Sequence, residues 1–135
     1  MALIYVVEDD TNILEIEMIA LRNSNYQVYG FSQASALYRQ MESILPDLIL
    51  LDIMLPDESG NEIVRKLRAD HKTAQIPVIM VTAKTSEIDL VKGLDDGADD
   101  YIRKPFSVME LLSRVKTLLR RTGQSIPNQL TVGEI

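Results

Sequence analysis

The sequence contains one run, Leu48-Ile49-Leu50-Leu51-Asp52-Ile53, in which a single carboxylate interrupts five apolar side chains. An apolar run of this length without alternation is typical of a strand that is buried on both faces, as in a parallel sheet. Residues 3–7 and 77–82 have the same character, and shorter β-rich runs occupy residues 27–31 and 100–103. The chain is therefore predicted to contain five strands.

Segments with helical periodicity separate these strands. The clearest covers residues 107–121, where one apolar stripe contains Val108, Leu111, Leu112, Val115, Leu118 and Leu119. Weaker stripes occur in residues 12–21, 32–44, 61–69 and 86–96. Ser107 and Glu110 have the spacing of a capping box, and Asn61 is a predicted N-cap of the third helix. Strand and helix alternate five times, which predicts an α/β fold: a doubly wound parallel sheet with helices on both faces.

The composition excludes several classes of protein. The 135 residues suit one domain, and 46% hydrophobic with 25% charged residues is ordinary for a globular protein. The chain has no cysteine, which excludes disulfides and thiolate metal sites. It has one histidine, His71, which argues against a Ser-His-Asp triad. A net charge of −6 argues against direct nucleic-acid binding. With neither a signal peptide nor a membrane span, we expect a cytoplasmic protein without a membrane partner.

Three acidic side chains follow predicted strands. Glu8 and Asp9 come directly after the first strand, and Asp52 ends the core of the third. Ligands of doubly wound sheets bind outside the carboxyl ends of the strands. If the sheet order is 2-1-3-4-5, the first and third strands are neighbours and the three carboxylates converge. Their mutual repulsion, about 4 kcal/mol for two charges 4 Å apart at a dielectric of 20, would be removed by a hard cation such as magnesium.

The alternative interpretation of such acids is that they are solvated loop residues. We prefer it for three further acids, Asp10, Asp57 and Glu58. It is weak for Asp52, because a charge within an apolar strand requires a partner. Thr82 ends the fourth strand and Lys104 the fifth. Each alone would be read as a capping threonine or a solvated lysine, but beside the carboxylates they favour a site that holds a phosphoryl group.

Five motifs stand at the strand ends: Val6-Val7-Glu8-Asp9-Asp10, Leu51-Asp52-Ile53-Met54-Leu55-Pro56-Asp57, Val81-Thr82-Ala83, Gly97-Ala98-Asp99-Asp100-Tyr101 and Lys104-Pro105-Phe106. In order and spacing they resemble the receiver domain of two-component response regulators. The resemblance covers residues 1–121 and implies the flavodoxin-like receiver fold with sheet order 2-1-3-4-5. Residues 122–135 are expected to be a linker and the start of a truncated DNA-binding output domain, or alternatively a frayed tail.

The resemblance implies a role for each residue at the strand ends. Asp52 would be the phosphoacceptor, taking a phosphoryl group from the phosphohistidine of a sensor histidine kinase. Magnesium would be bound by Asp9, Asp52 and the backbone carbonyl of Met54, and by Glu8 mostly through a water molecule. Such a domain catalyses its own phosphorylation and dephosphorylation but is not otherwise an enzyme.

Three further roles follow from the same resemblance. Lys104 would pair with one phosphoryl oxygen, Thr82 would donate a hydrogen bond to another, and Tyr101 would then change rotamer. Some members of the family carry a polar residue where this chain has the Met54 side chain, and Lys84 occupies another variable position. These two departures bear on the lifetime of the phosphoryl group rather than on phosphorylation itself.

The resemblance extends to the branch with a winged-helix DNA-binding output domain, whose receivers form homodimers on phosphorylation. The implied dimer face consists of Val91, Leu94, Asp95, Asp100, Glu110, Leu112, Arg114 and Lys116. Asp100 with Arg114 and Asp95 with Lys116 would pair across the dimer, although Leu90 stands where that branch often has a basic partner for Glu110. The alternative interpretation is that the charged residues of the last predicted helix face solvent and form no dimer interface.

The expected function is therefore that of a phosphorylated receiver that controls transcription, with DNA contacts made only by an output domain. One alternative is a stand-alone receiver that binds a protein target. A magnesium-dependent enzyme of the topoisomerase–primase type, or a haloacid dehalogenase-type hydrolase, would need a second acid where the chain has Met54. An FMN-binding protein would require a phosphate loop that Glu8-Asp9-Asp10 would repel.

Overall fold

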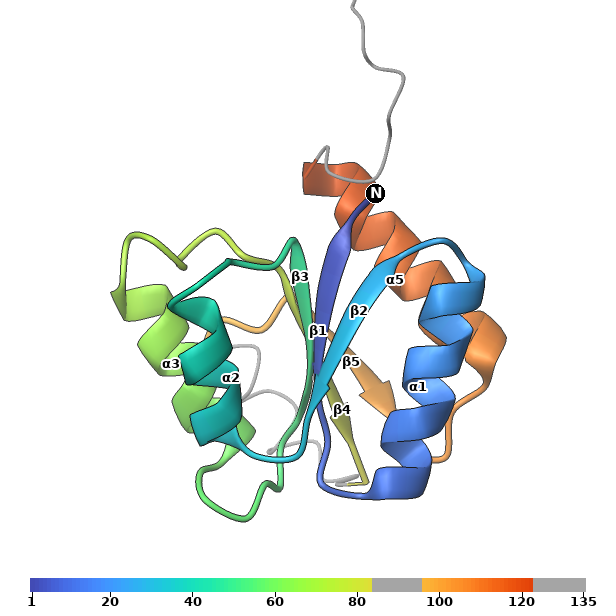
Figure 1. Cartoon of the computed structure of the whole chain (residues 1–135), viewed down its shortest axis with the longest axis horizontal. Helices are drawn as coiled ribbons and strands as arrows, with labels where there is room; N and C mark the ends of the chain where they lie inside the picture. Colours follow the sequence, from blue (N-terminus) through green and yellow to red (C-terminus); the bar gives the residue numbers. More distant parts are fainter. Residues whose placement is uncertain (84–95, 123–135) are drawn as a thin grey trace, which may run out of the picture.

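The computed structural model describes residues 1–83 and 96–122 (Figure 1). Its strands form one parallel sheet in the order β2-β1-β3-β4-β5. They are β1 (Leu3–Val7), β2 (Gln27–Phe31), β3 (Leu48–Asp52), β4 (Val78–Thr82) and β5 (Asp100–Arg103). The doubly wound sheet expected from the sequence, and the strand order implied by the resemblance, are confirmed.

Helices cover both faces of this sheet (Figure 1). The helices α1 (Thr11–Asn23) and α5 (Val108–Thr122) lie on one face, and α2 (Ala34–Met41) and α3 (Gly60–Ala69) lie on the other. Apart from residue 96, the helix predicted over residues 86–96 lies outside the described residues. Within residues 1–83 and 96–122, no helix is both long and apolar enough to span a bilayer.

The central strands are buried throughout, which explains their uninterrupted apolar runs. Every residue of β1, β3 and β4 is buried. Side chains alternate along a strand, so Tyr5 and Val7 pack in the core under α2 and α3, whereas Val6 packs in the core under α1 and α5. Leu50 belongs to the second of these cores. Asp52, two residues later, therefore lies on the α1/α5 side of the sheet.

The prediction that Asn61 caps the third helix was wrong. Ser59 is the N-cap, and its hydroxyl accepts a hydrogen bond from the Glu62 N–H at 3.2 Å. The helix begins one residue earlier than predicted because the Gly60 N–H donates to the Ile53 carbonyl at 2.7 Å, which holds the helix start against the end of β3. The Ser107 cap of α5 is confirmed, since its hydroxyl accepts from the Glu110 N–H at 2.9 Å.

The interpretation of three acids as solvated loop residues is confirmed for the exposure of Asp10 and Asp57, but it missed the hydrogen bonds that all three acids accept. Asp10 accepts hydrogen bonds from the first backbone N–H groups of α1 and is the N-cap of that helix. Asp57 accepts from the first N–H groups of α2, and Glu58 accepts from the Tyr38 hydroxyl. Asp10 and Asp57 stabilise helix starts, because the first N–H groups of a helix have no partner within the helix. Glu58 holds its loop against α2 through Tyr38.

Candidate functional site

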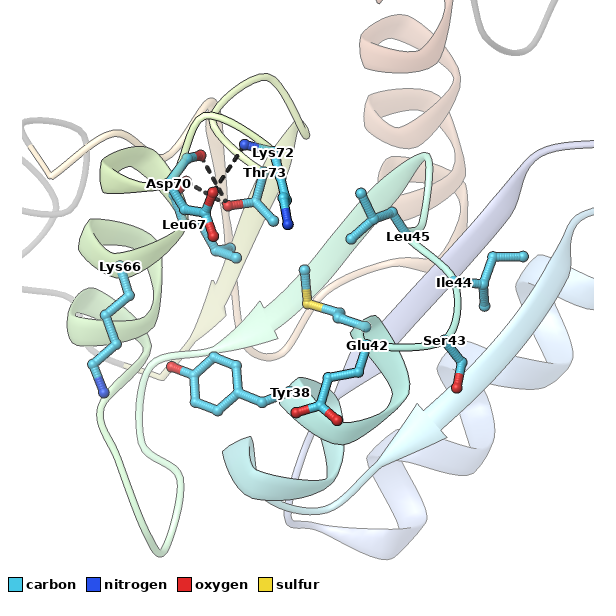
Figure 2. Close-up of a pocket in the computed structure, with 11 residues that line it drawn as sticks. Tyr38, Glu42, Ser43, Ile44, Leu45, Lys66, Leu67, Asp70, Lys72 and Thr73 are labelled. Atoms are coloured by element: carbon cyan, nitrogen blue, oxygen red, sulfur yellow. Dashed lines mark hydrogen bonds between the residues drawn. The ribbon is translucent and has the colours of Figure 1, made fainter.

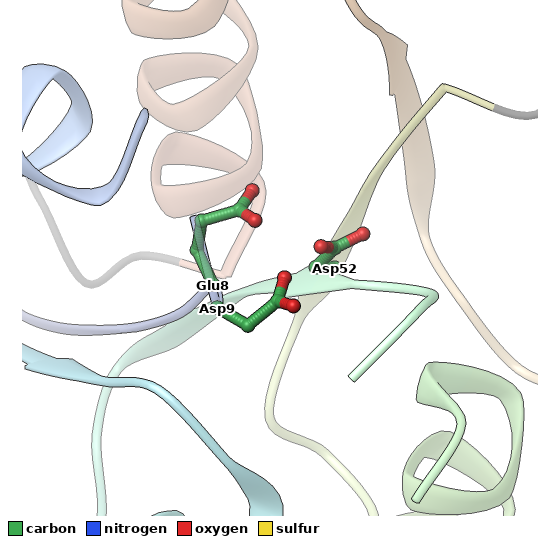
Figure 3. Close-up of side chains that lie close together, drawn as sticks. All are labelled: Glu8, Asp9 and Asp52. Atoms are coloured by element: carbon green, nitrogen blue, oxygen red, sulfur yellow. The ribbon is translucent and has the colours of Figure 1, made fainter. Parts of the chain in front are cut away.

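Glu8, Asp9 and Asp52 form an acidic cluster at the carboxyl ends of the strands (Figure 3). Each residue offers one carboxylate oxygen, and these oxygens lie within 4.8 Å of one another. The cluster forms because β1 and β3 are paired neighbours, with Val7 opposite Leu51. Glu8 is 1% exposed and Asp52 5% exposed, whereas Asp9 is open to solvent.

Lys104 supplies a positive charge to this cluster from the end of β5. Its Nζ lies 2.8 Å from Glu8 Oε1 and 3.4 Å from Asp52 Oδ2. The other oxygen of Asp52, Oδ1, accepts a hydrogen bond from the Met54 N–H at 3.2 Å. One ammonium therefore stands against three carboxylates, so the site carries excess negative charge when all three acids are ionised.

Burial sets the protonation of this cluster. Burial, and to a smaller extent hydrogen bonding with Asp52, raise the pKa of Glu8 to about 7 against the opposing effect of Lys104. Burial alone would lower the pKa of Lys104, but Glu8 and Asp52 outweigh it and the pKa is raised. The ammonium is therefore retained, and Glu8 holds a proton part of the time near neutral pH.

The donor set fits a hard divalent cation. All three groups are carboxylates, and neither an imidazole nor a thiolate is among them. Exposed Asp9 leaves the cluster accessible to an ion that keeps part of its water shell, as magnesium does. The buried Glu8 Oε1 makes no hydrogen bond of ordinary geometry despite its ion pair with Lys104, so it retains capacity for a further partner.

Thr82 lies at the carboxyl end of β4, and Tyr101 lies on the neighbouring strand β5, paired with Met80. Thr82 is the last residue of β4, which lies between β3 and β5, and it is 1% exposed. The Lys104 N–H donates to its carbonyl at 2.8 Å. Half-buried Tyr101 packs against the core under α2 and α3, as does Met80, two residues before Thr82. Strand alternation therefore places Thr82 and Tyr101 on the same side of the sheet.

The predicted dimer face is only partly described. Val91, Leu94 and Asp95 lie outside the described residues, while Leu112 is half-buried and Lys116 exposed on α5. The expectation that Arg114 pairs with Asp100 across a dimer stays a prediction, because the structure contains a single chain. In this single chain Arg114 Nη1 donates to both carboxylate oxygens of Asp100, each at 2.9 Å, because the start of β5 lies beside α5. Glu110 accepts from Arg114 Nε at 3.2 Å.

Sequence reasoning missed Glu17, a buried acid on α1. Glu17 is 1% exposed, and neither of its carboxylate oxygens has a hydrogen-bond partner among the described residues. The signal was present, because position 17 falls within the apolar stripe that contains Leu14 and Leu21. Burial, together with the nearby charge of Glu8, raises the pKa of Glu17 to about 8.

A cavity of about 620 Å³ has no part in this site (Figure 2). It opens between the later halves of α2 and α3 and the loop before β3, where Tyr38, Leu45 and Leu67 contribute apolar surface. These segments lie at the amino ends of the strands. The acidic cluster lies at the carboxyl ends, which is the edge where doubly wound sheets bind their ligands.

The parallel sheet of this order carries acids directly after β1 and at the end of β3, a hydroxyl at the end of β4 and a lysine directly after β5, the arrangement expected of a receiver domain. The chain belongs to the response regulator receiver domain family, whose sequence pattern matches residues 4–116. The resemblance deduced from the strand-end motifs is thereby confirmed.

Relatives and solved structures agree with this assignment. The chain is 39% identical over 132 residues to the DNA-binding response regulator MtrA of Mycolicibacterium smegmatis, covering 98% of this chain and 57% of MtrA. It is 45% identical over 120 residues to the phosphate regulon transcriptional regulatory protein PhoB of Pseudomonas aeruginosa, covering 89% and 52%. The chain thus spans slightly more than half the length of these relatives.

A similar solved structure is a response regulator receiver domain protein of Methanospirillum hungatei. Its TM-score is 0.84 at 32% identity, and the match covers 93% of this chain and 99% of that chain.

Proposed function

We propose that Asp52 accepts a phosphoryl group from the phosphohistidine of a sensor histidine kinase in a magnesium-dependent reaction. One observation carries the proposal: Asp52 is a buried carboxylate that lies both within the acidic cluster and 3.4 Å from the Lys104 ammonium. A buried carboxylate held between a cation site and an ammonium is suited to attack an electrophile that is itself anionic.

In the proposed reaction a carboxylate oxygen of Asp52 attacks phosphorus, and the phosphorus–nitrogen bond to the donor histidine breaks with its electron pair leaving on the imidazole. Lys104 pairs with one oxygen of the transferred group, and the Thr82 hydroxyl donates a hydrogen bond to another. Asp9, Asp52 and the Met54 carbonyl would hold magnesium, with Glu8 acting through water, and the ion would supply charge neutralisation. Because all these residues are on one chain, a small phosphodonor should replace the kinase.

Intact mass spectrometry tests this function. After incubation with magnesium and acetyl phosphate, the wild-type chain should gain one phosphoryl group, and in EDTA it should gain none. A folded wild-type protein that gains nothing in magnesium would refute the proposal.

Asp9→Ala is expected to abolish most of the rise in melting temperature that magnesium produces in the wild type. A ligand that binds only the folded state at a hundredfold excess over its Kd stabilises by about 2.7 kcal/mol. Without Asp9 the cluster loses its solvent-facing carboxylate. Differential scanning fluorimetry with and without magnesium measures the effect. Asp10→Ala is the matched control: it removes the cap of α1 and lowers stability but should keep the magnesium response.

We also propose that phosphorylation drives a homodimer through β5, α5 and the residues Val91, Leu94 and Asp95. We further propose that residues 122–135 are a linker and the start of a DNA-binding output domain. Two observations support this. The relatives MtrA and PhoB carry names of DNA-binding and transcriptional regulators, and this chain covers little more than half of each. Charged side chains Asp100, Glu110 and Arg114 gather around a groove of about 500 Å³ on this face.

Arg114→Glu is expected to prevent dimer formation while leaving phosphorylation of Asp52 intact. In a two-fold dimer each contact occurs twice. The single substitution Arg114→Glu therefore places a glutamate beside Asp100 and Glu110 in each copy, and these like charges repel. Sedimentation velocity in magnesium and beryllium fluoride measures the dimer fraction. Arg39→Glu, an exposed reversal on α2 across the sheet, should dimerise as the wild type does. A dimer of Arg114→Glu as strong as the wild type would place the interface elsewhere.

A further inference from the structure

The helix α2 has no N-cap of its own. Gln33 occupies the N-cap position with an extended backbone, but its side chain makes no capping hydrogen bond. Asp57, from the loop between β3 and α3, accepts hydrogen bonds from the Ala34 N–H at 2.9 Å and the Ser35 N–H at 3.0 Å. A carboxylate more than twenty residues away in sequence thus supplies the cap, where negative charge also interacts favourably with the helix dipole.

The loop that carries Asp57 is the one that follows the phosphoacceptor. Its two ends are held together by the hydrogen bond from the Gly60 N–H to the Ile53 carbonyl at 2.7 Å. A side chain at Gly60 would be excluded, since a Cβ there would lie 2.6 Å from the Asp52 carbonyl oxygen. At its start, the Met54 N–H donates to Asp52 Oδ1 at 3.2 Å. The loop base is therefore attached to the acidic cluster itself.

The tip of the same loop is attached to α2 and α3. Beside Asp57, the Glu58 carboxylate accepts a hydrogen bond from the Tyr38 hydroxyl of α2 at 2.9 Å. The other oxygen of Glu58 pairs with Lys66 Nζ of α3 at 2.6 Å. The path from the metal-binding residues to the start of α2 is thus short and continuous: Asp52, Met54, the loop tip, and the Ala34 and Ser35 amides.

We propose that Asp57 is a positioning residue for the metal site, which holds the 53–59 loop in its magnesium-binding form by capping α2. The inference rests on the proposed function and deepens it. Magnesium requires near-ideal octahedral geometry at short distances, so a small displacement of Met54 relative to Asp52 lowers its affinity. Coupling of two sites is reciprocal, so bound magnesium must in turn strengthen the contact between Asp57 and α2.

The first test compares Asp57→Ala, Asp57→Asn and the wild type in acetyl phosphate labelling over a magnesium titration. Asp57→Ala should need about fivefold more magnesium for the half-maximal rate, the factor that corresponds to loss of a typical helix cap. At saturating magnesium its rate should return to that of the wild type, because Asp57 touches neither the phosphoacceptor nor Lys104. Asp57→Asn should fall between the wild type and Asp57→Ala, because its amide keeps only one of the two oxygens that accept from the Ala34 and Ser35 N–H groups.

Asp47→Ala is the matched control. Asp47 Oδ2 accepts from the Leu3 N–H at 2.7 Å, which is a similar carboxylate-to-backbone bond at the opposite edge of the sheet. Its loss should lower the melting temperature without changing the magnesium requirement. If Asp47→Ala and Asp57→Ala raise the magnesium requirement equally, the effect is general destabilisation and the proposal is wrong.

The second test needs no phosphodonor, so it remains decisive if labelling of the wild type fails and the proposed function falls. Hydrogen exchange of the Ala34 and Ser35 amides, followed by NMR, should slow on addition of magnesium to the wild type. In Asp57→Ala magnesium should leave the exchange of both amides unchanged. Equal magnesium protection of these amides in the two proteins would overturn the proposal.

Discussion

Asp52→Asn is expected to gain no phosphoryl group under conditions in which the wild type gains one. Asparagine keeps the size of the side chain and an oxygen that can accept from the Met54 N–H, so the end of β3 should retain its structure. The neutral amide, however, is a far weaker nucleophile than the carboxylate and a weaker metal ligand. The loss would therefore report the chemistry of this one side chain rather than a change of fold.

Mass spectrometry after incubation with magnesium and acetyl phosphate provides the measurement. Asp47→Asn is the matched control, because it makes the same substitution at a carboxylate on the opposite edge of the sheet and should still be labelled. Labelling of Asp52→Asn to the extent of the wild type would move the acceptor to another carboxylate, with exposed Asp9 the first to examine.

Glu17→Gln is expected to remove a large part of the pH dependence of stability between pH 4.5 and 8. Glu17 is buried on α1 without a hydrogen-bond partner in residues 1–83 or 96–122. Burial, with smaller contributions from the charges of Glu8 and Asp52, raises its pKa from 4.5 to about 8 against the opposing charge of Lys104. Glutamine has nearly the same shape but does not titrate, so the substitution isolates the charge.

The sign of the effect follows from proton binding. Between pH 4.5 and about 8 the folded protein keeps the Glu17 proton while the unfolded chain releases it. The unfolded state then binds fewer protons, so the free energy of unfolding falls as pH rises through this window and levels off above it. At 1.36 kcal/mol per pKa unit, the fall attributable to this buried carboxyl is on the order of 5 kcal/mol.

Urea denaturation of metal-free protein at pH 5 and pH 8.5 measures this difference. The wild type and Glu17→Gln should be similar at pH 5, and the variant should be the more stable by several kcal/mol at pH 8.5. Glu15→Gln, at an exposed position on the same helix, serves as the control and should follow the wild type. Parallel pH dependence in the wild type and Glu17→Gln would show that Glu17 ionises freely in the folded state.

Several features of this protein could be predicted because their signals are local in the chain. A central parallel strand is buried on both faces, so its residues must nearly all be apolar, and β1, β3 and β4 show this directly. The positions of Asp52, Thr82 and Lys104 at strand ends follow from the same runs. The strand order did not follow from local signals; it came from the resemblance carried by the motifs, and only with that order do Glu8 and Asp52 meet.

Hydrogen bonds between distant segments could not be predicted in this way. Asp57 and Glu58 have the composition of a solvated turn, and nothing near them in the chain indicates donors 20 to 23 residues away. Asn61 is a reasonable cap by its residue type, yet the bond between Gly60 and Ile53 moved the start of α3 and made Ser59 the cap. In both cases a contact made across the fold decided which polar group was satisfied.

The sequence by itself determined the elements, the apolar faces and the residue types that stand at the strand ends, since these depend on short periodic patterns. Only the tertiary structure decided how charged groups are partnered. Arg114 pairs with Asp100 within the chain because β5 lies against α5, and Glu17 is left without a partner because α1 buries it where no donor of the described residues reaches. Electrostatic interactions depend on distance and burial in three dimensions, and neither is a property of spacing along the chain.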